Sequence, residues 1–345
     1  MNVVAKTPSL ASAELLIPPL VVRFSATGAI VAGGSVEPLA VRIDRSDAGV
    51  VLAPEPAAAT QVANAVATVA EALTAEDREA PPIEVVCADE AGRARLVAEA
   101  IAVPDGERLV VRPELLWQRP STWLAERDRP VYPELPVVTA GRRHPLRPAK
   151  PRGVVYARRI PWVNQTLRFR ALEVNRDLPL FHRWMNDPRV DAIWEEAGAL
   201  EAHRKSLEER AADPHLLTLI GEFDGAPFGY FELYWAKENR LGPFYDADDH
   251  DRGWHVLIGE DAFRGKDFIT AWLPSLMHYM FLDDPRTRRI VGEPRATHAQ
   301  QIRNLDKAGF AKVKHFDFPH KRALLVMLLR ERFFGDRLWA PEKTA

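Results

Sequence analysis

The sequence predicts a mixed α/β protein of the α+β kind, built from two parts, with its chemically informative residues in the second. A chain of 345 residues is longer than one ordinary domain, so two domains are expected. Strand-like alternation and helix-like spacing occur in both halves. Prolines gather between residues 130 and 151, which favours a boundary there. We therefore expect an N-terminal α/β domain at 1–150 and a second domain at 151–335.

The first half shows strands and helices but no grouping of reactive side chains. Residues 16–50 alternate between apolar and polar positions around Gly33-Gly34, which predicts strands joined by a hairpin. Valines at helical spacing predict a helix over 57–73. The other predicted elements of this half are a strand at 83–87, a helix at 90–101 and a strand at 109–112.

The second half has a clearer order of elements. Residues 141–152, rich in arginine and proline, predict a basic, semi-rigid and solvated linker before it. Its predicted strands cover 167–172, 216–222, 227–235, 253–259, 288–293, 310–317 and 321–330, and its predicted helices cover 178–185, 199–211, 268–281 and 299–308. Asn186-Asp187-Pro188 is a strong helix stop, and Gly309 is expected to be a left-handed cap because glycine has no Cβ to clash.

Composition excludes several classes of partner. The formal net charge of −2 gives no electrostatic case for nucleic acid, which needs a basic face. A single cysteine, Cys87, excludes an intramolecular disulfide and a cysteine-based zinc site, and no spacing of histidines and acids resembles a metal site. No signal peptide and no membrane span is predicted. We expect a cytoplasmic protein that uses no metal.

The strongest local signal is a strand, a turn and a helix. Gly253-Trp-His-Val-Leu-Ile-Gly259 is followed by Phe263-Arg264-Gly265-Lys266 and then by the helical run. A helix N-terminus has unpaired N–H groups and a partial positive charge, so it suits a pyrophosphate, and Arg264 and Lys266 add two cations. His255 lies on the strand that leads in. A titratable group beside a phosphate site is expected of an acyl-CoA-dependent transferase.

The element order over about 165–330 resembles the GNAT N-acyltransferase fold. Two strings add to this resemblance: Arg264-Gly265-Lys266 before the helix predicted at 268–281, and Lys307-Ala-Gly-Phe310 at the end of the helix predicted at 299–308. Five strings resemble one branch of it, the hydroxamate-siderophore acyltransferases. This branch includes the N-hydroxylysine acetyltransferases of the aerobactin type and the related mycobactin lysine acyltransferases. The strings are His182-Arg-Trp-Met-Asn-Asp-Pro-Arg-Val190, Gly229-Tyr-Phe-Glu-Leu-Tyr234, Tyr245-Asp-Ala-Asp-Asp249, Asp251-Arg-Gly-Trp-His255 and Glu293-Pro-Arg295. The order of the N-terminal half is compatible with a degenerate GNAT-like repeat.

The sequence departs from the usual GNAT pattern at two places. The phosphate loop of the superfamily runs Arg-x-x-Gly-x-Gly or Ala, whereas the corresponding positions here are Asp267 and Ile269. A carboxylate at Asp267 would compete with phosphate for the same amides. Leu305 lies about where many GNAT enzymes place a tyrosine that acts as general acid, so that proton must come from elsewhere.

The resemblance implies roles for individual residues. His255 is the candidate base, because a histidine titrates near neutral pH and an N-hydroxylamine is largely neutral there; without the resemblance, a core histidine is the simpler interpretation. Glu293 is expected to orient His255 or to raise its pKa, with a capping or surface acid as an even alternative. Acyl-CoA, acting as co-substrate, is expected to contact Ile258, Arg264, Gly265, Lys266, Phe268 and Arg303. For Arg303, a place on a solvated helix face is an equal alternative.

Four more residues are candidates for binding the acyl acceptor. A carboxylate at Glu232, in the middle of a strand, needs a partner, which a substrate ammonium or a buried arginine would equally supply. Asp251 is the member of an acidic loop nearest the strand of His255; a solvated loop is the simpler interpretation for the other members. Trp184 and Trp194 are expected in a flap over the acceptor, although tryptophans are more often part of a core.

The resemblance implies transfer of an acyl group, with acetyl-CoA as the expected donor, to the hydroxylated nitrogen of a small diamine or amino acid such as N6-hydroxylysine. The hydroxamate product would serve siderophore biosynthesis and iron acquisition, with a functional link to a siderophore synthetase and an N-hydroxylating monooxygenase. Two alternatives stay open. One is acetylation of an unmodified amine such as an aminoglycoside, and the other is a non-catalytic acyl-CoA-binding protein.

Overall fold

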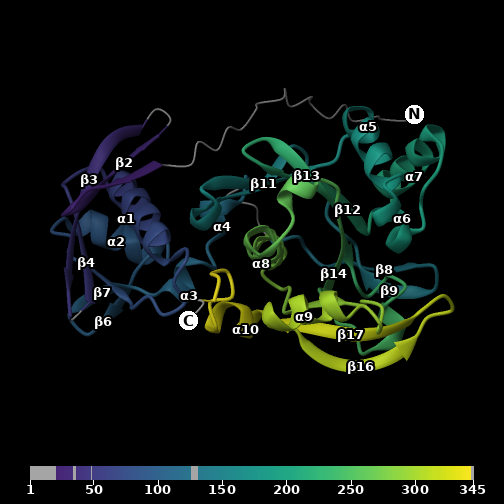
Figure 1. The fold of residues 1–345 in the computed structure, drawn as a ribbon. Coiled ribbons are helices and arrows are strands. Elements are labelled where there is room, and N and C mark those ends of the chain that lie inside the picture. The colour runs from purple at the N-terminus through teal and green to yellow at the C-terminus, as the bar shows by residue number, and fades with distance from the viewer. Residues whose placement is uncertain (1–20, 34–35, 48, 126–130, 343–345) are drawn as a thin grey trace, which may run out of the picture.

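The computed structural model describes residues 21–33, 36–47, 49–125 and 131–342, which form two main sheets with helices between and around them (Figure 1). The mixed α/β class predicted from the sequence is confirmed. The N-terminal half comprises β1 (Val21–Phe24), β2 (Gly28–Gly33), β3 (Val36–Ser46), β4 (Gly49–Pro54), α1 (Ala59–Thr74), β5 (Ile83–Val85), α2 (Glu90–Ala98), β6 (Val103–Asp105), β7 (Arg108–Val111), α3 (Pro113–Leu116) and α4 (Pro120–Trp123). β2 and β3 pair as the predicted hairpin; its turn and residues 16–20 lie outside the described residues.

The second half begins with a small hairpin and continues as an eight-stranded sheet. Its elements are β8 (Pro136–Thr139), β9 (Arg142–Pro145), β10 (Val154–Ile160), β11 (Gln165–Ala171), α5 (Val174–Met185), α6 (Pro188–Trp194), α7 (Leu200–Ala212), β12 (Leu216–Phe223), β13 (Ala226–Trp235), β14 (Arg252–Ile258), α8 (Lys266–Asp283), β15 (Arg289–Gly292), α9 (Ala299–Lys307), β16 (Ala311–Asp317), β17 (Arg322–Leu329) and α10 (Arg330–Gly335). The sheet order is β10-β11-β12-β13-β14-β15-β17-β16. Gly309 has a φ of 89°, as its predicted role as a left-handed cap requires.

Five elements of the second half were not predicted: β8, β9, β10, α6 and α10. Residues 154–160 form β10, and 330–335 form α10. The stop at Asn186-Asp187-Pro188 does end α5, but it also begins α6. The Asp187 side chain accepts a hydrogen bond from the Arg189 amide, and Pro188 occupies the first helical position. Asp at the N-cap and Pro at the first position are both typical helix starts, so the same residues carry both signals.

The expectation of a solvated linker at 141–152 is wrong. β9 pairs with β8, and the segment that follows packs on the C-terminal sheet. The Arg147 side chain is only 2% exposed, and its guanidinium bonds the carboxylate of Glu238 just after β13. A buried carboxylate of the second half therefore holds this arginine, a pairing that composition alone cannot reveal.

The two faces of the eight-stranded sheet are covered by different helices. On one face, Phe181 and Trp184 of α5 and Leu207 of α7 pack on Tyr230 and Leu257. On the other face, α8 packs on the alternate residues of β14, including Trp254 and Val256. The side chains of β14 thus alternate between the two faces of the sheet, as those of a β-strand do. His255 therefore points to the face that α5, α6 and α7 cover.

The two halves share one hydrophobic core. Trp117 from the first half stacks on Trp339, which follows α10, with ring centroids 4.8 Å apart. The indole of Trp339 donates to the Thr74 carbonyl at the end of α1. The side chain of Arg158 on β10 donates to the carbonyls of Ala75 and Trp339. In Figure 1, α8 and α10 accordingly lie between the two sheets.

The two sheets also share a connectivity. The N-terminal order β2-β3-β4-β5-β7-β6 corresponds strand for strand to β12-β13-β14-β15-β17-β16. In each set the third and fourth strands pair in parallel across an intervening helix, α1 or α8. A second helix, α2 or α9, precedes the last two strands. Among the described residues, no helix combines the length and the apolar character needed to cross a membrane.

Replacing Trp339 by Ala should lower the free energy of unfolding by about 3–5 kcal/mol, as for other fully buried aromatic side chains. The loss combines the buried ring, its stacking on Trp117 and its bond to Thr74. Urea unfolding monitored by circular dichroism measures it. Val313→Ala, on a half-exposed residue of β16, is the control and should change stability little. Equal effects of the two changes would contradict a shared core.

Candidate functional site

The candidate site is built on the antiparallel pairing of β13 with β14. The register places Glu232 directly opposite His255. The Nδ1 atom of His255 lies 2.9 Å from Glu232 Oε2, and its Nε2 atom lies 3.1 Å from Oε1 of Glu293. Glu293 follows the end of β15, the strand that pairs with the start of β14. One imidazole thus bridges two carboxylates, and the sequence-predicted pair His255 and Glu293 lies in direct contact.

Both carboxylates are buried, whereas the imidazole reaches solvent. Glu232 and Glu293 are 6% and 4% exposed, and the His255 side chain is 26% exposed. Burial disfavours the imidazolium, but attraction to Glu293 and Glu232 outweighs it and raises the pKa of His255 to about 9. Burial also disfavours an ionised Glu293, but His255, Lys321 and Arg240 hold its pKa well below the usual range. In the free protein at neutral pH, the imidazole is therefore charged.

Glu232 has partners within the chain on both of its oxygens. Oε1 accepts from the Tyr230 hydroxyl at 2.9 Å and lies 2.8 Å from Arg210 Nε, while Oε2 faces His255. Arg210 also bonds both oxygens of Glu196. The buried arginine that the sequence left as an alternative partner is thus present. A contact between Glu232 and the substrate stays a prediction.

The two tryptophans predicted at the acceptor site occupy different positions. The ring of Trp194, at the end of α6, lies 6.3 Å from the His255 ring, edge to face. Trp184 is buried and packs on the backbone at Gly259, where a Cβ atom would lie 2.3 Å from its ring. Its indole donates to Glu260. Trp194 therefore borders the histidine, and Trp184 supports the end of β14.

Asp251 does not contact the histidine. Its carboxylate binds Arg289 through two bonds of 2.8 Å and also accepts from the Tyr245 hydroxyl. Both carboxylate oxygens of Asp251 therefore accept hydrogen bonds just before β14 begins, whereas His255 lies further along the strand. These contacts fix the loop that enters β14, and a contact of Asp251 with substrate remains a prediction.

The turn before α8, predicted to bind an anion, follows the point where β14 and β15 separate. β14 and β15 pair only at Arg252 and Gly253 of β14, after which β14 runs on to Ile258 alone beside β13. Gly265 has a φ of 105°, a conformation that favours glycine, and the first bond of α8 runs from the Ile269 amide to the Gly265 carbonyl. Amides at this N-terminus are therefore available to a ligand.

The side chains at this turn are mostly exposed. Arg264 is half exposed and lies 3.1 Å from the carboxylate of Asp261, and Lys266 and Asp267 are exposed too. Phe268 packs edge to face against Phe223 and Phe263, which anchors the first turn of α8. Arg303 on α9 is exposed and donates to Gln300. Ile258 offers its backbone, and its carbonyl accepts from Arg189.

Sequence reasoning missed several groups that surround the histidine. The Tyr234 hydroxyl donates to Glu293 Oε2 at 2.9 Å, while Arg240 and Lys321 also contact this residue. Tyr234 reaches it across Gly253, where a Cβ atom would lie 2.1 Å from the tyrosine ring. The alternation of Tyr230, Glu232 and Tyr234 along one strand was a usable signal. Nothing in the sequence indicates that Arg240 and Lys321 would meet there.

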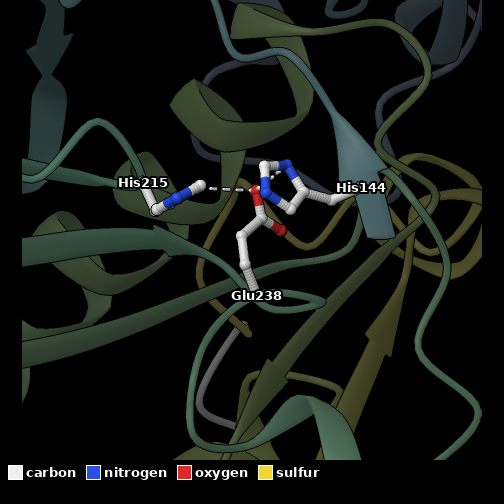
Figure 2. Close-up of side chains that lie close together, drawn as sticks. All are labelled: His144, His215 and Glu238. Atoms are coloured by element: carbon white, nitrogen blue, oxygen red, sulfur yellow. Dashed lines mark hydrogen bonds and ion pairs between the residues drawn. The ribbon is translucent and has the colours of Figure 1, made fainter. Parts of the chain in front are cut away.

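A second polar cluster joins β9 to the C-terminal sheet (Figure 2). His144 and His215 both direct Nδ1 at the Glu238 carboxylate, over 3.3 Å and 2.9 Å. The three residues have the spacing of a metal site, which the sequence did not indicate. Arg147, however, donates to both carboxylate oxygens. A guanidinium already balances the charge of Glu238, and we interpret the cluster as the anchor of the 142–147 segment.

Comparison with known proteins defines the class. Residues 173–318 match the acetyltransferase (GNAT) domain family. The solved structure of an uncharacterized protein from Bacillus halodurans superimposes with a TM-score of 0.51 and 30% identity, over 54% of this chain and 94% of that one. The C-terminal half therefore has the GNAT fold that the sequence predicted.

Two curated relatives narrow the class. The N(6)-hydroxylysine O-acetyltransferase of Escherichia coli is 40% identical over 229 residues, which cover 66% of this chain and 72% of that protein. The N(5)-hydroxyornithine:cis-anhydromevalonyl coenzyme A-N(5)-transacylase of Beauveria bassiana is 49% identical over 195 residues, which cover 55% of this chain and 43% of the relative. The chain thus spans less than half of the fungal relative. It belongs to the siderophore hydroxamate acyltransferase family of the GNAT superfamily.

The raised pKa of His255 predicts a pH-dependent contribution to stability. Because the pKa is about 9 in the folded state and near 6.5 when unperturbed, the contribution is fully present below pH 6.5 and is lost as pH rises through 9. The difference in unfolding free energy between wild type and His255→Gln should therefore shrink over this range. Urea unfolding at several pH values measures it, and parallel pH curves for the two proteins would contradict the bridge between the carboxylates.

Proposed function

We propose that this protein transfers an acyl group from acyl-CoA to the hydroxylated nitrogen of a small N-hydroxy-amine, giving a hydroxamate for siderophore biosynthesis. The observation that carries the proposal is the position of His255, between two buried carboxylates and on the strand that leads into the α8 turn. The names of the relatives support an N-hydroxylated ornithine or lysine side chain as acceptor. Their names include different acyl groups, so acetyl is proposed from the bacterial relative alone.

The chain offers suitable groups for acyl-CoA. Phosphate oxygens would meet the free amides at the N-terminus of α8, together with Arg264 and Lys266. The pantetheine arm would lie where β14 and β15 separate, next to the backbone of Ile258. Asp267 stands in the same first turn, but its side chain is exposed and can turn away from a phosphate. Arg303 on α9 would extend the cationic surface. Direct transfer between the two substrates is proposed, since Cys87 is buried in the other half.

In the reaction, the nitrogen of the acceptor attacks the thioester carbonyl. A C–N bond forms, the C–S bond breaks, the nitrogen loses one proton and the leaving thiolate gains one. The His255–Glu293 pair would receive the proton from the nitrogen. With His255 neutral, Nε2 is the acceptor. With His255 charged, only a carboxylate oxygen can accept, and the imidazolium stabilises negative charge instead. We propose Trp194 as the wall that holds the acceptor against His255.

The two protonation states give different pH profiles. If neutral His255 is the proton acceptor, kcat/KM should rise with pH up to about 9, which is the pKa of His255 in the free protein. His255→Ala should lower kcat by roughly 10²–10⁴ and abolish that rise, measured with acetyl-CoA and N6-hydroxylysine. A wild-type profile that is flat from pH 6 to 9 would assign His255 to charge stabilisation. Unchanged kcat in His255→Ala would make the histidine structural.

The proposed acyl-CoA site has a separate test. Arg264→Glu should weaken acyl-CoA binding by about 1–3 kcal/mol, because a charge-assisted bond to phosphate is replaced by repulsion. Isothermal calorimetry with CoA measures the affinity. Arg332→Glu is a matched control, since Arg332 is 48% exposed against 50% for Arg264 and also pairs with an acid on its own turn. If both variants bind CoA as wild type does, the phosphates bind elsewhere.

A further inference from the structure

Three cationic or titratable side chains gather around the ring of Phe318, beside the histidine, and a fourth residue, Arg295, lies on a neighbouring segment. Arg240 and Lys321 each lie 5.5 Å from the centre of this ring, and His320 stacks on it. Arg295, two residues after Glu293, pairs through its backbone with Ala323, which follows Lys321 by two residues. We call Arg240, Arg295, His320 and Lys321 the cationic rim.

The rim contacts Glu293, the carboxylate that faces His255 Nε2. Arg240 Nη2 lies 3.1 Å from Glu293 Oε1, the same oxygen that faces His255 Nε2. Lys321 donates to the Glu293 carbonyl and is largely buried. The Arg240 side chain, in contrast, is 49% exposed. A guanidinium has five N–H donors, so Arg240 can hold Glu293 and still present donors to a ligand.

The charges around the site are unequal. Among the described residues, the ion pairs that surround His255 and the rim contain five cations, His255 included, and four carboxylates: Arg210, Arg240, His255, Arg295 and Lys321 against Glu195, Glu196, Glu232 and Glu293. Burial lowers the pKa of Lys321; Glu293 opposes this shift, and Arg240 and Arg295 add to it. The neighbouring cations also lower the pKa of His320, after desolvation. One additional anion would relieve this repulsion.

We propose that Arg240 and Arg295 form a subsite for the carboxylate of the acceptor, which selects N-hydroxylated amino acids over N-hydroxylated diamines. This inference rests on the proposed function. The remote end of a diamine or an aminoglycoside carries only positive charge, which the rim repels. The remote end of an amino acid carries a carboxylate, which arginine binds through paired hydrogen bonds. Its ammonium has a partner in Glu195, which is 71% exposed and pairs with Arg295.

The test compares two acceptors that differ only in the carboxylate, N6-hydroxylysine and N-hydroxycadaverine, with acetyl-CoA and the full chain. Wild type should favour hydroxylysine in kcat/KM by about 10- to 100-fold, the effect of losing one charge-assisted interaction. Arg240→Gln should reduce this preference several-fold, mainly by raising KM for hydroxylysine. Arg240→Lys should retain part of it, because the charge remains. Arg295→Gln provides a second variant should Arg240 prove necessary for folding.

Arg332→Gln, at a site of equal exposure on α10, is the control and should leave the preference unchanged. Equal kcat/KM for the two acceptors in wild type, or an equal loss for both in Arg240→Gln and Arg295→Gln, would overturn the subsite. Use of N-hydroxycadaverine with succinyl-CoA at the rate of hydroxylysine with acetyl-CoA would assign the rim to the acyl group instead. Acylation of neither acceptor would reject the proposed function itself, and the subsite with it.

Discussion

The antiparallel register of β13 and β14 is the constraint on which the site depends. It sets Glu232 opposite His255 and Tyr234 opposite Gly253. Glycine at the second position lets the tyrosine ring cross β14 and reach Glu293 on the next strand. A shift by one residue would turn all of these side chains to the face that α8 covers. Two buried carboxylates are costly in isolation, so the charged imidazole between them is also part of what stabilises this register.

The two halves have the same connectivity but differ at the point where chemistry would occur. β14 and β15 separate after two paired residues, whereas β4 and β5 stay paired through Leu52 and Val85, and the Val86 amide bonds the Leu52 carbonyl. Two prolines, Pro54 and Pro56, precede α1 where the second half has Gly265 and two cations. Proline has no N–H to offer an anion. These features support our proposal that the first half is a degenerate GNAT-like repeat without an acyl-CoA site, retained for its share of the common core.

The sequence predicted correctly those features whose signal lies within one short segment. The helical spacing of valines predicted α1, the strand and turn around His255 predicted the entry to α8, and Gly309 predicted a left-handed cap. It did not predict contacts between segments that are far apart along the chain. Arg147 reads as part of a solvated linker because its partner, Glu238, lies 91 residues away. Arg210, which contacts Glu232, and the residues of the cationic rim likewise meet partners that are distant in the sequence. Periodicity shows which face a residue occupies, but not which charge from another element it will meet.

The electrostatics of the site bear on why a hydroxylamine suits it better than an amine. An alkylamine is protonated near neutral pH, so it would bring a further cation to an imidazole that is itself charged, beside a rim of arginine and lysine. It would also have to lose a proton before attack. A hydroxylamine enters neutral and with its lone pair free, so it avoids both costs. Its positive charge develops only after attack, next to Glu293, where the buried carboxylate can stabilise it.

The same field that repels a protonated amine attracts the carboxylate of an amino-acid acceptor. The proposed selection of the nitrogen and of the remote end of the acceptor thus has one origin, the excess of cations around two buried acids.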